Sequence, residues 1–269
     1  YAEDLRIDYS ILEQHAESYR KIRNTFRYLL GNLNDSFESN DLSKLEVKKL
    51  PELEQFMLHK IYTLNLNFDK YFKNYDFHNL YKELLNFCTV DLSAFYFDIR
   101  KDTLYCDSKE SEKRKSTLIL LNTILDSLLK WFAPILSFTT EEIYQLVSKN
   151  KKSIHLERFL SFPKKFENPE LNLKWERLLK IRDVCNLSIE QKRANKEIGS
   201  SLEATLKIKL NVEYLELVKD IDLSELCITS SAIVDKGDKS IIEVETFKAE
   251  GNKCPVCWKI SSKPCERHG

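Results

Sequence analysis

The sequence has 269 residues, 42% of them hydrophobic, with only five Gly and six Pro, which is typical of an ordered and mainly helical protein. Forty-two basic residues balance forty-two acidic ones, so a polyanion has to be recognised by local patches of charge and not by a global field. No stretch reaches the roughly twenty uninterrupted apolar residues of a membrane span, and we expect no membrane partner.

The first predicted helix covers residues 10–33, where apolar side chains recur every three or four positions. Ser10 and Glu13 have the spacing of a capping box at its start. A row of polar side chains lies beside this apolar face at helical spacing: Arg20, Arg23, Asn24 and Arg27. The last fourteen residues of the helix contain no acidic residue. Cations without local partners repel one another, and such a row suits phosphate binding. A solvated basic face is the alternative interpretation.

Four more helices are predicted in the first half of the chain. Their apolar periods cover residues 51–72, 77–99, 111–132 and 139–147, with a break at 101–109. The helix at 111–132 is apolar nearly all round, which predicts a central position. Residues 1–149 are therefore expected to form an antiparallel helical bundle.

The second half is predicted to be a long helix followed by a small α/β module, residues 150–250. Residues 149–165 read as a basic linker that crosses the surface, and Asn168-Pro169 cap and open a helix that extends to about Ala194. Strands are expected at 202–210, 226–234 and 241–248, with a short helix at 212–218 and a turn at 236–238.

Residues 251–269 contain a candidate metal knuckle. Two ligand pairs with short spacing are separated by seven residues: Cys254, Cys257, Cys265 and His268. Zn²⁺ prefers this sulfur and nitrogen donor set, and four protein ligands leave no open position, so the ion would be structural. A Cys254–Cys257 disulfide is the alternative, although the odd count of seven Cys favours buried thiols and a metal in a reducing compartment. Trp258 either packs over the site or is offered to a partner such as a nucleobase.

Sequence signatures of an active site are absent from the printed chain. It contains no glycine-rich phosphate loop, no HExxH and no GxSxG, so no catalytic residue is assigned. The sequence indicates a binding protein.

Five segments, in the same order along the chain, resemble bacterial isoleucyl-tRNA synthetases, which belong to class I of the aminoacyl-tRNA synthetases. They are AESYRKIRNTFRYLLGNLNDSF (16–37), FHNLYKELLNFCTVDLSAFYFDIRKDTLYCD (77–107), KWFAPILSFTTEEIYQ (130–145), KRANKEIGSSLEA (192–204) and CPVCW (254–258). The HIGH and KMSKS signatures of that class are not in these residues. The resemblance therefore falls on the C-terminal portion, and Tyr1 is expected just after the catalytic domain.

The resemblance implies an anticodon-binding domain followed by a zinc-binding domain. Its partners would be the anticodon stem-loop of isoleucine tRNA and the catalytic domain of the same polypeptide, in a cytoplasmic monomer. ATP and Mg²⁺ would belong to the catalytic domain, so this chain alone would be catalytically inactive. The residues matched to tRNA contacts are Arg20, Arg23, Asn24, Arg27, Arg193, Lys196 and Trp258.

Two departures from the family pattern concern the knuckle: its loop has only seven residues, and His268 stands where cysteine is common. Two alternatives remain open. The chain could be the same region of a valine- or methionine-specific relative, or a zinc-stapled helical scaffold that binds proteins.

Overall fold

The computed structural model describes residues 7–33, 42–148, 152–237 and 242–268. The chain divides into two compact units, described in turn. Tyr1–Arg100 and Ser108–Glu167 form the first, and Lys101–Asp107 and Asn168–Gly269 form the second. No helix within these described residues is long and apolar enough to cross a membrane.

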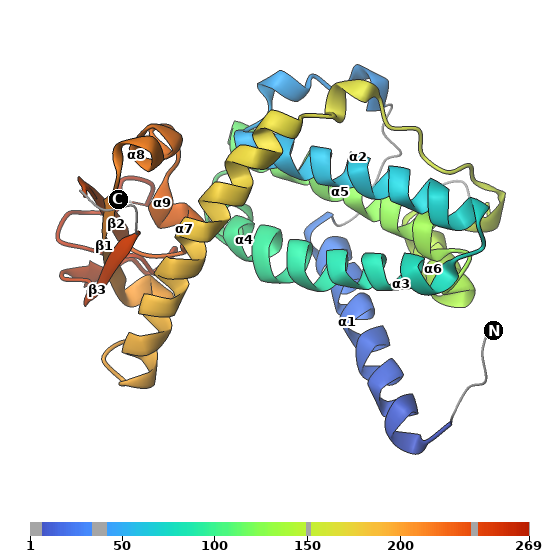
Figure 1. Cartoon of the computed structure of the whole chain (residues 1–269), viewed down its shortest axis with the longest axis horizontal. Helices are drawn as coiled ribbons and strands as arrows, with labels where there is room; N and C mark the ends of the chain where they lie inside the picture. The colour runs from blue at the N-terminus through green and yellow to red at the C-terminus, as the bar shows by residue number, and fades with distance from the viewer. Residues whose placement is uncertain (1–6, 34–41, 149–151, 238–241, 269) are drawn as a thin grey trace. The chain divides into compact units, whose positions relative to one another are not determined.

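The first unit is a helical bundle (Figure 1). Its longer elements are α1 (Tyr9–Leu33), α2 (Glu52–Lys73), α3 (Phe77–Asn86), the π-helical segment η4 (Phe87–Tyr96), α4 (Phe97–Cys106, shared with the second unit), α5 (Glu112–Phe132) and α6 (Ser137–Val147). Short 3-10 turns are η2 (Leu42–Lys44), η3 (Val47–Lys49), η5 (Ile154–Leu156) and η6 (Lys164–Phe166). The predicted helical bundle is confirmed.

Helix α5 forms the centre of this bundle, as its all-round apolar pattern predicts. Every residue from 120 to 133 is buried, and α5 packs against α1, α2 and α6. Burial of one large apolar side chain such as Phe132 stabilises the fold by about 1.5–3 kcal/mol. The ring of Phe68 contacts both Trp131 and Phe159. Because Phe159 belongs to the predicted linker 149–165, aromatic contacts attach this linker to the bundle.

A buried ion pair and its hydrogen bonds link four elements: α2, η4, α4 and α5. Arg100 binds Glu54 through two hydrogen bonds of 2.6 Å, and Tyr96 donates to the same carboxylate at 3.0 Å. Thr117 of α5 adds a fourth contact at 3.3 Å. Because the side chains of Glu54 and Arg100 are 0% and 3% exposed, each charge depends on the other for its solvation.

Three local predictions differ from the structure. Helix α1 begins at Tyr9, and Asp8 takes the capping role by accepting from the amide and hydroxyl of Ser10 at 2.8 and 2.7 Å. The third predicted helix does not stop before 101 but continues as α4 to Cys106. Helix α6 begins at Ser137, two residues before the predicted capping box. Charged residues occur both in loops and on the exposed surface of a helix, so the sequence alone does not distinguish the two. This explains why the sequence predicts a break where α4 continues.

The second unit combines a long helix with two small sheets. Its elements are α7 (Pro169–Ala194), η7 (Ser201–Glu203), β1 (Ala204–Leu210), α8 (Val212–Val218), α9 (Leu223–Leu226), β2 (Ser231–Lys236), β3 (Glu243–Lys248), β4 (Asn252–Lys253) and β5 (Ile260–Ser261). Asn168 caps α7 as predicted, by accepting from the amide of Leu171 at 3.1 Å.

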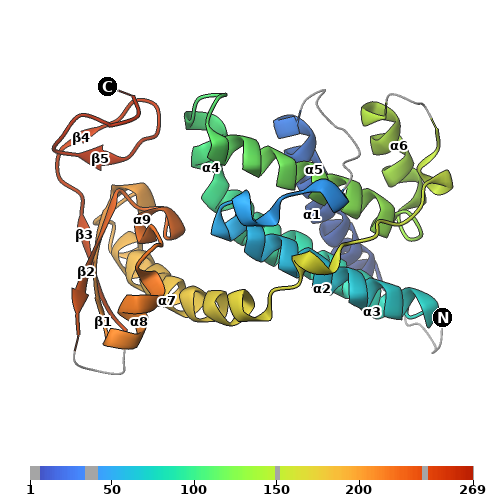
Figure 2. The same ribbon diagram turned by 90° about the horizontal axis from the view of Figure 1, so that it is seen from above.

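The three-stranded sheet has the order β2-β1-β3, and α7 packs against β1 and β3 (Figure 2). Strand β1 alternates as predicted, with Ala204, Leu206, Ile208 and Leu210 buried. β2 is parallel to β1, reached by a crossover through α8 and α9, whereas β3 is antiparallel to β1. The strands on either side of the predicted turn at 236–238 do not pair with each other, because β1 lies between them. Asp238 lies outside the described residues.

Candidate nucleic-acid interface and metal centre

One side of α1 presents polar side chains to solvent because the other side is fixed in the bundle. Ile22, Phe26 and Leu29 are 0–1% exposed and hold the helix in place. The four polar residues predicted to share a face, Arg20, Arg23, Asn24 and Arg27, are all exposed. A rigid helix thus carries three guanidinium groups and one amide at positions that solvent reaches.

Two of these arginines have acidic neighbours, which corrects the expectation of cations without local partners. Arg20 forms an ion pair with Glu17 at 2.6 Å, and the guanidinium of Arg23 lies 3.8 Å from Glu142 of α6. All four side chains stay 44–70% exposed, so these pairs are screened by water and worth little energy. Over the described ranges, no ion pair or hydrogen bond is recorded for the side chain of Arg27, which leaves its charge uncompensated.

The predicted metal ligands come together in the second unit. The ligand atoms of Cys254, Cys257, Cys265 and His268 all lie within 4.8 Å of one another. The Cys257 and Cys265 sulfurs are 3.9 Å apart, and Nδ1 of His268 is 3.3 Å from the Cys265 sulfur and 3.5 Å from that of Cys254. A tetrahedron with metal–sulfur bonds of about 2.3 Å has sulfur–sulfur edges of about 3.8 Å. The four groups therefore fit a tetrahedral ion.

The main chain around the cysteines favours thiolates. The N–H groups of Cys257 and Val256 lower the pKa of Cys254 to about 6, and the N–H of Arg267 lowers the pKa of Cys265. Burial raises the pKa of Cys257. The other four cysteines are free thiols outside this cluster. Cys88, Cys185 and Cys227 are buried, and Cys106 is half-buried. Thiolates are the form that ligates metals, so the local amides prepare this cluster for a cation.

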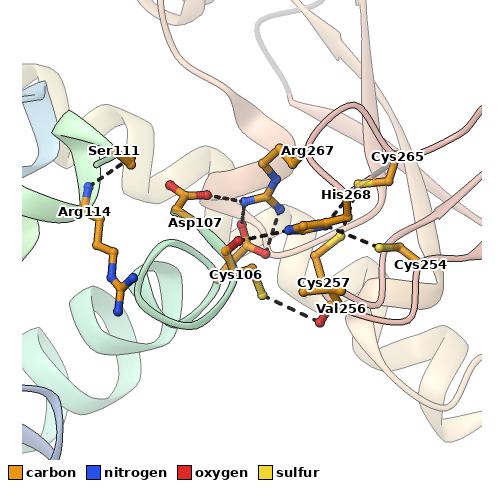
Figure 3. A network of polar contacts seen from close by, with 11 residues as sticks. Cys106, Asp107, Ser111, Arg114, Cys254, Val256, Cys257, Cys265, Arg267 and His268 are labelled. Carbon is orange, nitrogen blue, oxygen red and sulfur yellow. Dashed lines mark hydrogen bonds and ion pairs between the residues drawn. The ribbon is translucent and has the colours of Figure 1, made fainter. Parts of the chain in front are cut away.

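The last turn of α4 lies beside the knuckle and belongs to the same compact unit (Figure 3). Nε2 of His268 lies 3.0 Å from the main-chain carbonyl of Cys106. Arg267 binds both carboxylate oxygens of Asp102, at 2.7 and 2.9 Å, and reaches Asp107 at 2.7 Å. Burial opposes ionisation of Asp102, yet Arg267 lowers the pKa of this carboxyl below its usual value. The ligand pair Cys265–His268 is thus tied to α4 by contacts outside the ligand set.

Trp258 is 59% exposed, so packing alone does not account for it. Its φ of +65° closes the knuckle turn, in which its amide donates to the carbonyl of Cys254 at 3.0 Å. A left-handed backbone costs a non-glycine residue about 1–2 kcal/mol. The ammonium of Lys253 lies 5.3 Å from the indole centroid. The ring is a large aromatic surface with a cation beside it.

Arg193 and Lys196 line a shallow depression after α7, together with Gly199, Glu203 and Lys248. Arg193 is paired with Glu190 at 2.6 Å, and Lys196 occupies a turn with φ of +58°. Both cations are exposed, but acids share their surroundings, so the depression has mixed charge. These residues and Trp258 belong to the second unit, whereas the α1 residues belong to the first.

A family model provides the decisive comparison. The model described as "Anticodon-binding domain of tRNA ligase" matches residues 54–210, more than half of the chain. The chain belongs to this family.

Curated relatives of this anticodon-binding chain carry the name isoleucine–tRNA ligase. One from Pelagibacter ubique is 69% identical over the whole chain, which covers 30% of that protein. Relatives from Agrobacterium fabrum and Caldicellulosiruptor saccharolyticus are 38% and 39% identical over 97% of the chain, covering 28% and 29% of their lengths. The chain thus spans less than a third of the relatives that it matches.

Sequence reasoning missed the residues that support these sites in the anticodon-binding chain. Glu17 could have been found, because its spacing of three from Arg20 is that of a helical ion pair. Glu142 of α6, Asp102 and Cys106 of α4, and Asp107 just after α4 could not, because they are joined to their partners by contacts across 119 to 165 positions.

Proposed function

We propose that this chain recognises the anticodon stem-loop of isoleucine tRNA as part of an isoleucine–tRNA ligase. The observation that carries the proposal is the exposed row Arg20, Arg23, Asn24 and Arg27 on a helix whose opposite side is buried in the bundle of an anticodon-binding family member. The relatives' shared name supports the amino acid. The remainder of such a ligase, with ATP and Mg²⁺, performs the chemistry, in a cytoplasmic monomer.

The α1 face supplies the groups that loop recognition needs. Sequence-specific RNA binding uses unstacked loop bases, which stack on aromatic rings or guanidinium planes and form hydrogen bonds at their edges. Arginines on α1 bind phosphates or stack on bases, and the amide of Asn24 both donates and accepts at a base edge. Arg193 and Lys196 contact the backbone of the same strand, and Trp258 stacks on a base.

The knuckle holds one structural Zn²⁺ in this proposal. The donor set of three thiolates and one imidazole, with spacings that fit a tetrahedron, supports zinc. The ion would fix the turn that carries Trp258, and it leaves no open coordination position for catalysis. The ion's contribution is to the fold of residues 252–268.

The test of the tRNA interface uses the full ligase that contains this chain. Arg23→Ala and Arg27→Ala are expected to raise the KM for isoleucine tRNA about tenfold and to leave tRNA-independent amino-acid activation, measured by pyrophosphate exchange, unchanged. Lys48→Ala, an exposed cation on η3, is the matched control and should keep the wild-type KM. Unchanged KM in both arginine variants would contradict the assignment.

Two further measurements separate the alternatives. A protein-binding scaffold would bind tRNA transcripts without salt dependence, whereas a phosphate-binding face weakens as salt rises. A valine- or methionine-specific relative would prefer transcripts with those anticodons over the isoleucine anticodon. Affinities across a panel of anticodon variants therefore test the amino-acid assignment independently of the arginines.

A further inference from the structure

Phe138, the second residue of α6, has 93% of its surface exposed. Among the large apolar side chains that the structure describes, it has the highest exposure. The next residue along, Thr139, is buried, and its hydroxyl forms a 2.7 Å hydrogen bond with the hydroxyl of Tyr19 of α1. The start of α6 is therefore fixed against α1 while the ring of Phe138 projects into solvent.

Phe138 lies on the side of α6 that adjoins the basic row of α1. It is four residues before Glu142, so the two side chains share a face of the helix. Glu142 is the residue whose carboxylate approaches Arg23 at 3.8 Å. Arg23 in turn donates to the Tyr19 hydroxyl at 3.2 Å. Arg23 of the basic row thus contacts Glu142, which shares a helix face with Phe138, and Tyr19, whose partner Thr139 directly follows Phe138.

Phe138 has the surroundings of a base-stacking site and not of a protein-docking patch. Glu142, one turn along the same helix face, is charged and is paired with Arg23, whereas protein contacts favour contiguous apolar patches. The next exposed apolar residue on the same helix face, Leu146, is two turns away. Single-stranded nucleic acids bind where cations follow the backbone and an aromatic face accepts a base.

We propose that Phe138 is a stacking platform for one unpaired base of the RNA whose phosphates lie on the basic row of α1. The inference rests on the proposed function and extends that interface from α1 to α6. Tyr19 and Thr139 act as positioning residues, because their hydrogen bond fixes the distance between the ring and the arginines.

The test compares three variants of the full ligase on an anticodon stem-loop RNA carrying 2-aminopurine at single loop positions. Phe138→Ala should weaken binding about tenfold, and Phe138→Trp should retain affinity, because only an aromatic face is needed. Leu146→Ala is the matched control, a change at another exposed apolar side chain two turns away, and should bind like wild type. Stacking on residue 138 should quench 2-aminopurine at one position in wild type and not in Phe138→Ala.

The salt dependence separates this inference from the proposed function. Phe138→Ala should lower affinity at every salt concentration with the same slope, because no phosphate contact is removed. Full affinity in Phe138→Ala alongside a loss in Arg23→Ala would overturn the stacking site and leave the α1 interface standing. Equal losses in Phe138→Ala and Leu146→Ala would show that the effect does not depend on the aromatic ring at position 138, which also overturns the inference. Absence of RNA binding by wild type would reject the proposed function itself.

Discussion

The imidazole of His268 donates a hydrogen bond from Nε2 to the main-chain carbonyl of Cys106, at 3.0 Å, across 162 positions of the sequence. A carbonyl can only accept, so the proton must be on Nε2, and the lone pair of Nδ1 in the neutral ring faces the cysteine sulfurs. Metal-ligating histidines are commonly oriented by such a partner. The end of α4 therefore sets the tautomer of the fourth candidate ligand.

Arg267→Met is expected to weaken metal binding, although Arg267 is not a ligand. Its guanidinium joins the Cys265–His268 turn to Asp102 and Asp107, and its loss frees that turn to move. Removing groups that orient ligands typically lowers metal affinity by roughly 10- to 100-fold. Zinc transfer from the purified ligase to a chromogenic chelator, measured at equilibrium, gives the ratio directly.

The control for that experiment is Lys263→Met, which removes an exposed cation of the same loop. Asp102→Asn should lower zinc affinity as Arg267→Met does, because Arg267 binds both carboxylate oxygens of Asp102. If Arg267→Met and Lys263→Met released zinc alike, the contact with α4 would have no role in metal retention.

Metal content tests the ligand set itself. Wild-type ligase should contain one zinc at this site, and Cys257→Ser should lose it, because a serine hydroxyl remains protonated and is a poor zinc ligand. Cys106→Ser is a demanding control: its thiol lies 3.7 Å from the Val256 carbonyl, next to the cluster, but only its main chain contacts a ligand. Elemental analysis should find zinc retained in Cys106→Ser; loss there would mean that Cys106 ligates.

Local chemistry made much of the bundle and the knuckle predictable from the sequence. The all-round apolar pattern of α5 could only be buried at a centre, and the spacing of the cysteine pair brings Cys254 and Cys257 onto one turn. The alternation in β1 likewise follows from a single buried face. In each case the signal lies within a few residues of the feature that it predicts.

The remaining features depend on contacts between distant segments. Alternation identifies β2 and β3 as strands, but it does not say which neighbours they take, so the β2-β1-β3 order was missed. The sequence predicts a break at 101–109, whereas the helix continues to Cys106, because the partner that accounts for Asp102 is Arg267 at the other end of the chain. Pairing at such separations leaves no periodic trace.

The buried pair Glu54–Arg100 should dominate the stability of the bundle. Arg100→Met leaves the Glu54 carboxylate buried without its cation, and breaking a buried pair in this way costs about 3–5 kcal/mol. The double variant Glu54→Leu/Arg100→Met removes both charges and should recover part of that loss. Urea unfolding followed by circular dichroism measures both. A double variant that is no more stable than Arg100→Met would show that the pair supplies more than mutual solvation.

The salt dependence of tRNA binding counts the phosphate contacts of the α1 face. Each cation that neutralises a phosphate of a single strand contributes about 0.7 to the slope of log K against log salt. Arg20→Gln, Arg23→Gln and Arg27→Gln should therefore each reduce the slope by up to that amount. Arg27 should approach the full value, because no acid among the residues that the structure describes forms an ion pair with it, whereas Glu17 and Glu142 must first release Arg20 and Arg23. Binding isotherms between 50 and 200 mM salt, with Asn24→Ala as the uncharged control, supply the slopes.

A slope that falls equally for Asn24→Ala and Arg27→Gln would show that the row acts through shape and hydrogen bonds and not through charge.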